Sequence, residues 1–424
     1  MKICFVNLPV RTSAPPNNVP LGIYYLGTDL KQQGYDVVYV DLNLYRPEIT
    51  LENAFSLIPV DCDIYCLSGL ITTFKWQAAL AKKIKAEIGK PIISGGGLAS
   101  NLKEKLLDFI PELGIVFSGE GETSLGYLLR DLPETRLVFT PAVCDNLALV
   151  PDWENVVGIE TYIRNPIWGG VAKNSSYIPF QMLRSLNMVT SRGCPFGCMF
   201  CSKDACGGRN YRTRTAEHVA LEFNKLVTTY HLDFIGFVDD NMTADKARLR
   251  HMSNYPLLAK WGCHSRFDAF NNEQDLIDIK ALGCEYLGFG GESANKEILA
   301  SMRKNNNPEH MIRVLGWCRK TGVHPNVTWM MGWPGETREQ VRETAQFILQ
   351  YAPENKNLFV ATAYPGTGLW DMVESQVLGK YGNLRNYVEQ LGDATLPVMN
   401  YSAMPDEEFN EVVAMVRSGE LESL

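Results

Sequence analysis

This sequence of 424 residues lacks several features that mark large classes of proteins. It contains no run of about eighteen apolar residues, so we expect no membrane-spanning helix. Its first residues form a short apolar run that ends in a proline-rich turn, without the longer apolar region and cleavage site of a signal peptide, and we therefore expect a cytoplasmic protein. Lys and Arg number 40 against 48 Asp and Glu, for a formal net charge of −8. Because nucleic-acid affinity depends on Lys and Arg that neutralise phosphates, we expect no nucleic-acid partner.

The first third of the chain predicts a doubly wound α/β domain without a dinucleotide fingerprint. Short β-branched runs alternate with amphipathic stretches, which is typical of a parallel sheet covered on both faces. The predicted strands are 3–8, 36–42, 64–68, 91–94 and 115–118, and the predicted helices are 22–33, 74–88, 102–109 and 123–132. No glycine follows the first strand, where a Rossmann cofactor site has G-x-G-x-x-G, so a dinucleotide is not expected.

Glycine-rich turns follow the fourth and fifth predicted strands instead. Ligands of doubly wound sheets lie beyond the carboxyl ends of the strands, where glycine lets the backbone come close. We expect a cofactor to contact the residues of these two turns, which are Ser94, Gly95, Gly96 and Gly97 after the fourth strand and Gly119, Glu120 and Gly121 after the fifth. The alternative is a pair of helix amino termini that bind no ligand.

Three cysteines stand close together in the middle of the chain, after an apolar run at 186–190. Cys194, Cys198 and Cys201 have the spacing C-x3-C-x2-C, which can bind three irons of a [4Fe–4S] cluster and leave the fourth iron open to a small chelating ligand. A zinc site that adds Cys206 is the alternative, since four thiolates can bind zinc tetrahedrally. The total of eleven cysteines is odd, which argues against a disulfide framework.

The cysteine spacing, with Phe200 before the last thiol, resembles the radical S-adenosylmethionine (SAM) superfamily. The resemblance implies that the open iron binds SAM, that Phe200 contacts this cofactor, and that a flavodoxin- or ferredoxin-type reductant drives cleavage of SAM to a 5'-deoxyadenosyl radical. The glycine turns and the Val-Pro-Leu-Gly segment at 19–22 resemble the cobalamin-binding domain that precedes the cluster motif in one branch of that superfamily. That domain would bind cobalamin without a histidine of its own, because all six histidines, starting with His218, lie beyond it.

From residue 187 onward, larger strand–helix units predict a second α/β domain. The predicted strands are 188–192, 234–238, 262–267, 286–290, 326–331 and 358–363, and six units predict a partial (β/α)6 TIM barrel with its chemistry at the carboxyl ends of the strands. The resemblance places contacts with SAM at these ends, namely Arg266 for the carboxylate, Gly290, Gly291, Glu292 and Ser293 for the amino group, and Met331 and Gly332 for the adenine. The alternative role for Arg266 is an ordinary salt bridge to Asp239 or Asp240.

We predict four parts of the chain: a cobalamin-binding-like domain over 1–135, a linker over 136–186, the partial barrel over 187–367 and a helical segment over 368–424. The short last segment indicates a small molecule or a peptide as substrate. The resemblance implies a cobalamin-dependent C-methyltransferase. A cyclase or other rearrangement enzyme, or an aminocarboxypropyl transferase whose first domain holds no cobalamin, would have the same motifs, and a zinc-structured binding protein is the alternative outside this superfamily. The sequence does not single out a catalytic acid or base.

Overall fold

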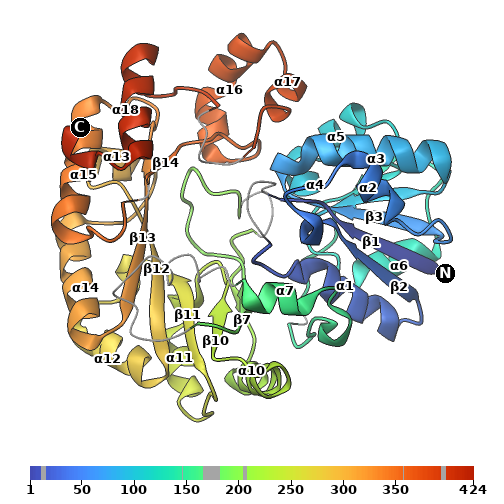
Figure 1. Cartoon of the computed structure of the whole chain (residues 1–424), viewed down its shortest axis with the longest axis horizontal. Coiled ribbons are helices and arrows are strands. Elements are labelled where there is room, and N and C mark those ends of the chain that lie inside the picture. Colours follow the sequence, from blue (N-terminus) through green and yellow to red (C-terminus); the bar gives the residue numbers. More distant parts are fainter. Residues whose placement is uncertain (11–15, 146, 166–181, 204–207, 357, 393–397) are drawn as a thin grey trace.

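The computed structural model describes residues 1–10, 16–145, 147–165, 182–203, 208–356, 358–392 and 398–424. Two six-stranded sheets lie side by side, one from the first third of the chain and one from its middle and later parts (Figure 1). Neighbouring strands within each of these sheets run parallel. This architecture confirms the predicted α/β class, with a doubly wound sheet followed by a partial barrel.

The first sheet has the strand order β2-β1-β3-β4-β5-β6. Its strands are β1 (Lys2–Asn7), β2 (Asp36–Asp41), β3 (Ile64–Ser68), β4 (Ile92–Gly95), β5 (Ile115–Phe117) and β6 (Leu137–Phe139). Its helices are α1 (Leu21–Gln32), α2 (Leu51–Ser56), α3 (Phe74–Glu87), α4 (Gly96–Leu102), α5 (Glu104–Phe109) and α6 (Ser124–Arg130). The strand order reverses between β1 and β3, and in sheets of this kind the crevice at that reversal, beyond the carboxyl ends of the strands, is where ligands bind.

Three elements of this domain, β6, α4 and the short helix α2, are not predicted from the sequence. Strand β6 is an apolar run of only three partly buried residues, too short to stand out as a strand, and it pairs with β5 inside the segment expected to be a linker. Helix α4 begins at Gly96, within the glycine turn, where low helix propensity predicts a turn rather than a helix.

Both faces of the first sheet are buried, as expected for parallel strands covered by helices. In β1, Ile3 and Phe5 belong to one apolar cluster and Cys4 and Val6 to the other. The same division separates Cys66 from Cys4, so these two thiols lie on opposite faces of the sheet and do not form a common site.

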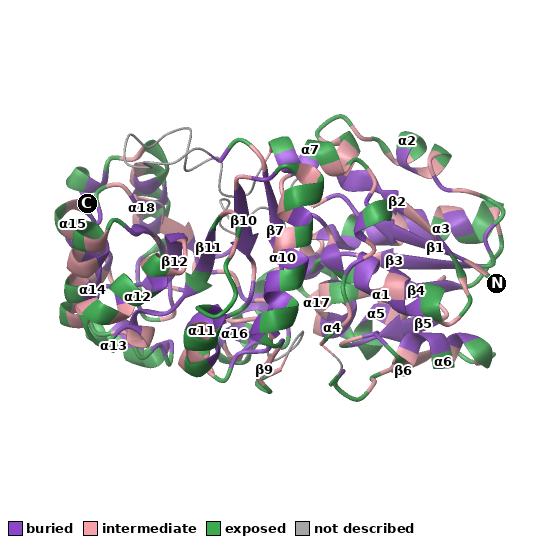
Figure 2. Ribbon diagram, turned by 90° about the horizontal axis from the view of Figure 1, so that it is seen from below, coloured by how far each residue is buried: buried purple, intermediate pink, exposed green. Residues whose placement is uncertain are grey.

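The second sheet has the order β14-β13-β12-β11-β10-β7, and each of its six strands overlaps a predicted one. Its strands are β7 (Ser185–Met188), β10 (Phe234–Phe237), β11 (Lys260–Ser265), β12 (Cys284–Glu292), β13 (His324–Met331) and β14 (Leu358–Val360). Helices on its outer side are α10 (Ala216–Tyr230), α11 (Lys246–Met252), α12 (Glu273–Ala281), α13 (Lys296–Ser301), α14 (Pro308–Thr321) and α15 (Arg338–Tyr351). Figure 2 shows that buried residues are concentrated on the strands, whereas α10 and α11 carry exposed residues on their outer faces.

A two-stranded antiparallel hairpin, β8 (Ser191–Arg192) and β9 (Arg212–Thr213), follows β7. The chain between these two short strands contains the three spaced cysteines. The hairpin therefore fixes both ends of the cysteine loop.

The connector between the two sheets packs against both of them. Helix α7 (Ile159–Arg164) carries Tyr162, whose hydroxyl donates to Asp41 at the end of β2. Trp153 is buried and its indole Nε1 donates to Glu222 of α10, with 2.7 Å between the nitrogen and the carboxylate oxygen. The other tryptophan of this segment, Trp168, lies outside the described residues.

The last segment is helical, as predicted, and consists of α16 (Gly368–Tyr381), α17 (Leu384–Val388) and α18 (Asp406–Ser418). Helix α18 begins directly after Pro405, where three acidic residues occupy its first turn. Its Phe409 ring reaches the end of β13 and lies 3.0 Å from the place a Cβ atom would take on Gly332. Among the described residues there is no helix with the length and apolar character that crossing a membrane requires.

Replacing Trp153 by phenylalanine is expected to lower the free energy of unfolding by about 1 to 3 kcal/mol, because a buried carboxylate oxygen of Glu222 loses its indole donor. Urea denaturation followed by circular dichroism measures the loss. The control is Leu221→Ala on the same helix, whose side chain is 64% exposed, and it is expected to change stability by less than about 0.5 kcal/mol. Equal effects of the two variants would contradict a role for this hydrogen bond.

Candidate functional site

The cysteine loop leaves the hairpin through Gly193, which has a left-handed φ of 78°. A Cβ atom there would lie 2.3 Å from the carbonyl oxygen of Asn210, so the tight passage between the two ends of the loop requires glycine. Cys194 is buried, whereas Cys198 and Cys201 are partly exposed. Burial raises the pKa of the Cys201 thiol above its ordinary value, although the backbone N–H and the charge of Lys203 act in the opposite direction.

Cationic side chains surround this loop. The guanidinium of Arg266 lies with Nη1 3.6 Å from the sulfur of Cys198 and stacks on the ring of Phe196 at 3.8 Å from its centroid. The guanidinium of Arg209 packs against Gly197, 3.1 Å from the position of a Cβ atom there. Positive charge beside three thiolates suits an anionic iron–sulfur centre, because such a centre is negative overall.

The thiols do not form a ready single-ion site. Within the part of the chain that the structure describes, no three His, Cys, Asp or Glu side chains are grouped closely enough to hold one metal ion. In a [4Fe–4S] cluster each cysteine binds a different iron, so its three thiolates need not meet at one point. Cys206, the fourth thiol of the zinc alternative, lies outside the described residues.

Arg266 is paired with Asp268 through two hydrogen bonds, of 2.8 Å from Nε and 2.7 Å from Nη2. The alternative of a salt bridge to Asp239 or Asp240 is therefore wrong. Asp239 instead accepts hydrogen bonds at the start of the hairpin, including one from the hydroxyl of Ser191 at 2.7 Å, and Asp240 pairs with Lys203.

Phe200 faces the other side of the site, where its ring meets that of Trp333 edge to face at 6.3 Å. The ammonium of Lys304 lies 5.8 Å from the centroid of the Phe200 ring. The backbone N–H of Met199, the residue before Phe200, donates to Met302 at 3.0 Å. The cysteine loop therefore contacts both the loop that follows α13 and the turn that follows β13.

The loop after α13, which contacts the cysteine loop, also contacts the carboxyl end of β12 and so links the two. Glu292 has a left-handed φ of 65° and accepts from Lys304 at 2.9 Å. The side-chain amide of Asn306 donates to the carbonyl groups of Gly290 and Gly291 at 2.8 and 3.0 Å. The structure thus places three of the four residues predicted from this turn close to Lys304 and Asn306.

The fourth residue, Ser293, points elsewhere. Its side chain is buried and its hydroxyl lies 3.2 Å from that of Thr344 in α15, outside the sheet. Met331 is likewise fully buried among the outer helices, whereas Met330 is only partly buried on the other face of the sheet. A ligand inside the barrel would therefore meet Met330 rather than the side chain of Met331.

The turn after β13 is organised by a buried carboxyl group. Glu336 accepts from the backbone N–H groups of Gly332 and Trp333 at 2.6 and 3.2 Å through one oxygen. Its other oxygen is buried and has no hydrogen-bond partner in the described part of the chain. Burial raises the pKa of Glu336 to about 7, although the two N–H donors lower it. Gly332 adopts a left-handed φ of 78°, which lets the chain leave the strand sharply.

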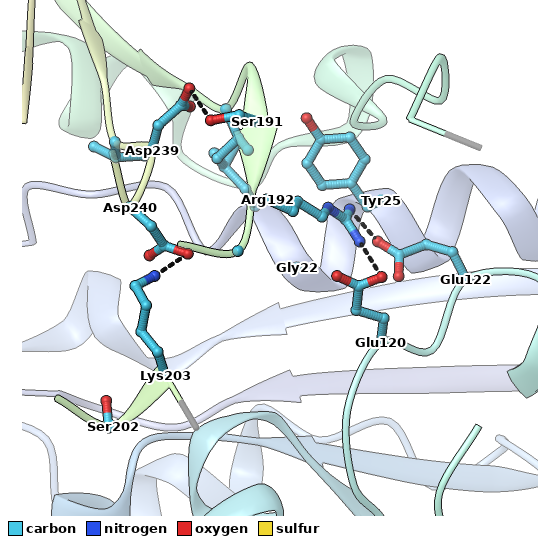
Figure 3. Close-up of a pocket in the computed structure, with 14 residues that line it drawn as sticks. Gly22, Tyr25, Glu120, Glu122, Ser191, Arg192, Ser202, Lys203, Asp239 and Asp240 are labelled. Atoms are coloured by element: carbon cyan, nitrogen blue, oxygen red, sulfur yellow. Dashed lines mark hydrogen bonds and ion pairs between the residues drawn. The ribbon is translucent and has the colours of Figure 1, made fainter. Parts of the chain in front are cut away.

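A cavity of about 360 Å³ opens beside the cysteine loop, at the junction of the two sheets (Figure 3). It is lined by the start of α1, the turn after β5, the hairpin and the end of β10. Arg192 points from the hairpin toward Glu120 and Glu122 of the first sheet, and its Nη1 lies 3.6 Å from Glu120. Arg212 donates to the same Glu120 through Nη1 and Nη2 at 3.0 and 2.6 Å.

Glu120 is therefore held in an ion-pair network, although the sequence predicts it as a cofactor contact. Burial acts to raise its pKa, but the hydrogen bonds from Arg212 and the charge of Arg192 outweigh burial, and the pKa lies below its ordinary value. The carboxylate is thus charged at neutral pH and joins the first sheet to the hairpin.

The remaining residues of the two glycine turns lie at the carboxyl ends of β4 and β5. Among the described residues, no atom stands within 4 Å of a Cβ position on Gly95, and only the Pro141 ring does so on Gly119, so the described chain leaves both backbones open. Gly96 has a left-handed φ of 77°, and its Cβ position would be 2.9 Å from the carbonyl oxygen of Gly69. Gly97 follows within α4.

Two residues of these turns are covered by protein. Ser94 is fully buried and accepts from the side-chain amide of Gln77. Gly121 packs against Leu26 of α1, with 2.8 Å from its Cβ position to Cδ2. The structure therefore leaves an accessible backbone at Gly95 and Gly119 and a covered one at Ser94 and Gly121.

The sequence does not predict several residues that shape this site. Arg192, Arg212 and Glu122 belong to no motif, and their pairing depends on how the two sheets meet. Lys304 lies well after the β12 turn in sequence. It reaches this turn only because helix α13, which lies between them in the chain, brings the following loop back to it. The available signals are that Arg192 stands two residues before the first cysteine of the motif and that Glu122 directly follows the glycine turn at 119–121.

Known proteins similar to this chain are consistent with this geometry. Residues 188–348 match the model of the Radical SAM superfamily. An uncharacterised methyltransferase of Pyrococcus horikoshii is 27% identical over 442 residues, which cover 97% of this chain and 91% of the relative.

Two solved structures resemble the fold over most of the chain. The radical SAM methyltransferase TsrM from Kitasatospora setae, with cobalamin and a [4Fe–4S] cluster bound, has a TM-score of 0.63 and 19% identity over 89% of this chain and 78% of that chain. The cobalamin-dependent radical SAM enzyme OxsB, with aqua-cobalamin and SAM bound, has a TM-score of 0.67 and 17% identity over 99% of this chain and 61% of that chain.

Glu336→Gln is expected to remove part of the dependence of stability on pH. A carboxyl group whose pKa rises from 4.5 to about 7 on folding stabilises the fold below pH 4.5, and this stabilisation is lost as pH rises through 7, by roughly 3 kcal/mol in all. Denaturation is measured at pH 5.5 and 8.5. The free energy of unfolding of the variant, relative to that of the parent, should be higher at pH 8.5 than at pH 5.5. The control, Glu339→Gln at an exposed site in the same helix start, should show a difference from the parent that does not vary with pH.

Proposed function

We propose that this chain, which belongs to the radical SAM superfamily, is a cobalamin-dependent C-methyltransferase that acts on a small molecule or a peptide. The observation that carries the proposal is the position of the three-thiol loop. It lies at the carboxyl edge of the partial barrel, and its supporting hairpin is ion-paired to the carboxyl edge of the doubly wound sheet. A cluster on the loop and a cofactor on the other sheet would therefore serve one cavity.

Cys194, Cys198 and Cys201 are the proposed ligands of a [4Fe–4S] cluster. When bound, the cluster supplies the electron that cleaves SAM to a radical, and this chain supplies the cationic surroundings described above. The proposed contacts with SAM are Phe200, the backbone at Gly290 and Gly291, and Glu292. Lys304 holds the Glu292 carboxylate in place at 2.9 Å, which orients it toward the end of the barrel.

The adenine side of SAM is proposed to lie near the turn at Met331 and Gly332. The Gly332 backbone is fixed there by the carboxylate of Glu336 at 2.6 Å. Because the Met331 side chain is buried outside the sheet, its contribution would come from the backbone.

The doubly wound sheet is the proposed cobalamin site, where bound cobalamin would carry to the substrate a methyl group taken from one SAM, with S-adenosylhomocysteine left behind. The open backbone at Gly95 and Gly119 fits a large planar ligand that approaches the carboxyl ends of β4 and β5 closely. Gly96 and Gly97 belong to the same turn. The protein side of this site would be formed by the buried Ser94, the packed Gly121 and the ion-paired Glu120.

The division of the chain at 135, 186 and 367 is also a proposal, with β6 added to the first unit because it pairs with β5. A flavodoxin- or ferredoxin-type protein is the proposed reductant, and the cytoplasm the proposed location.

Anaerobic incubation with SAM, a strong chemical reductant and cobalamin, followed by mass spectrometry of the nucleosides, tests the reaction. S-adenosylhomocysteine that forms only with cobalamin, together with 5'-deoxyadenosine, is expected. Deoxyadenosine without S-adenosylhomocysteine would instead indicate a rearrangement such as cyclisation, and methylthioadenosine would indicate aminocarboxypropyl transfer.

Cys198→Ala tests the cluster assignment. After anaerobic reconstitution with iron and sulfide, the parent is expected to show a broad visible absorbance band and about four irons per chain, and the variant to lose most of both. The matched control is Cys62→Ala, which removes a buried thiol from the apolar cluster behind the first sheet and should leave the band intact. A colourless parent that binds stoichiometric zinc would contradict the proposal.

A further inference from the structure

Arg266 is held against the cysteine loop by three separate contacts. Its side chain is only 8% exposed and forms the two-point ion pair with Asp268. Its guanidinium stacks on Phe196, within the cysteine loop, at 3.8 Å. The remaining donor, Nη1, is directed at the sulfur of Cys198 at 3.6 Å, within the range of a hydrogen bond to sulfur.

This arrangement differs from a site for the carboxylate of SAM, which is the role expected from the sequence. A guanidinium that clamps a free carboxylate in two-point fashion needs two adjacent donors. In Arg266, Asp268 already takes the Nε–Nη2 edge of the guanidinium, and Nη1 faces the thiol, so a second carboxylate would have only the Nη1–Nη2 edge and would compete with Cys198 for Nη1.

We propose that Arg266 is a positioning residue that tunes the reduction potential of the cluster through a hydrogen bond to the sulfur of Cys198. This inference rests on the proposed function, because it requires a cluster on that thiol. Reduction adds negative charge to the cluster and its sulfurs. A fixed cation that donates an N–H to a ligand sulfur stabilises the reduced form more than the oxidised form, and so makes the cluster easier to reduce.

The roles of the neighbours follow from this geometry. Asp268 fixes the plane of the guanidinium, and Phe196 fixes its height above the loop. Both residues act on the arginine and not on the cluster. The planar side chain matters because a lysine ammonium in the same place would be a hydrated point charge without a fork to hold it.

The test is a reductive titration of the reconstituted protein with mediators, monitored by electron paramagnetic resonance, first without SAM and then with it. At a fixed solution potential, Arg266→Gln is expected to lower the ratio of reduced to oxidised cluster about tenfold, which is about 59 mV for a one-electron couple. Arg266→Lys keeps the charge and should lower the ratio by less, about threefold. The control is Arg313→Gln, which removes an exposed arginine from α14 and should leave the ratio unchanged.

The outcomes separate this inference from the function beneath it. A parent protein that assembles no cluster contradicts both. A parent with a cluster whose ratio Arg266→Gln leaves unchanged overturns the inference alone. So does a change that appears only when SAM is present, because that result would assign Arg266 to the carboxylate of SAM. If Arg266→Gln fails to assemble a cluster, the expected threefold change in Arg266→Lys decides, and an unchanged ratio in that variant overturns the inference.

Discussion

The ion pairs between two arginines of the hairpin and two glutamates of the first sheet determine how the halves of this molecule meet. Arg192 stands immediately before the cysteine loop and Arg212 follows it, and they reach Glu120 and Glu122 in the turn after β5. Because the same two arginines occupy both ends of the cysteine loop, the contact between the sheets also sets the position of the thiols. Any change in the angle between the sheets would therefore move the proposed cluster relative to the open glycine backbones.

Burying these charges costs solvation energy that their attraction only partly offsets, so the network is weak evidence for added stability. Its value lies in geometry. The two-point contact of Arg212 with Glu120 fixes distance and direction together, and the same carboxylate also accepts from the backbone N–H of Cys144 at 2.9 Å. An apolar contact of equal area would hold the sheets together without fixing their relative position. Such precision matters where two cofactors must serve one cavity.

Patterns that are local in sequence predicted the architecture well. The alternation of apolar runs and amphipathic stretches gave the six strands of the partial barrel and five of the six in the first sheet, because burial on both faces leaves a continuous apolar signal. The missing strand, β6, is an edge strand whose apolar run is only three residues long, too short to be told from a loop. The cysteine loop was predicted from spacing alone, since its residues are adjacent in the chain.

The detailed roles of the site residues depend on contacts between distant segments, and the sequence could not supply these. Glu120 stands in a glycine turn that fits a cofactor site, but Arg212 is 92 positions later and takes its carboxylate. Arg266 stands at a strand end where the resemblance implies contact with the SAM carboxylate, yet Asp268, only two residues away, takes the Nε and Nη2 donors of its guanidinium. Ser293 and Met331 follow the right strands, but strand alternation and the sharp turns point them outward. A motif fixes where the backbone goes, whereas the direction of a side chain depends on its partner.

Two strained backbone positions lie where the β12 turn meets the cysteine loop. Glu292 and Arg303 have left-handed φ values of 65° and 51° although neither is glycine, and such conformations cost on the order of 1 kcal/mol or more each. Glu292 is one partner of the Glu292–Lys304 ion pair and Arg303 directly precedes the other, and this pair brings the end of β12 to the Phe200 side of the cysteine loop. Relaxing either residue would turn the carboxylate or the ammonium away from the other. Other described residues with a left-handed φ, such as Thr123 and His231, lie elsewhere, but these two stand at the junction of the glycine-rich turn and the cysteine loop, where a ligand of the proposed cluster's open iron would have to contact both.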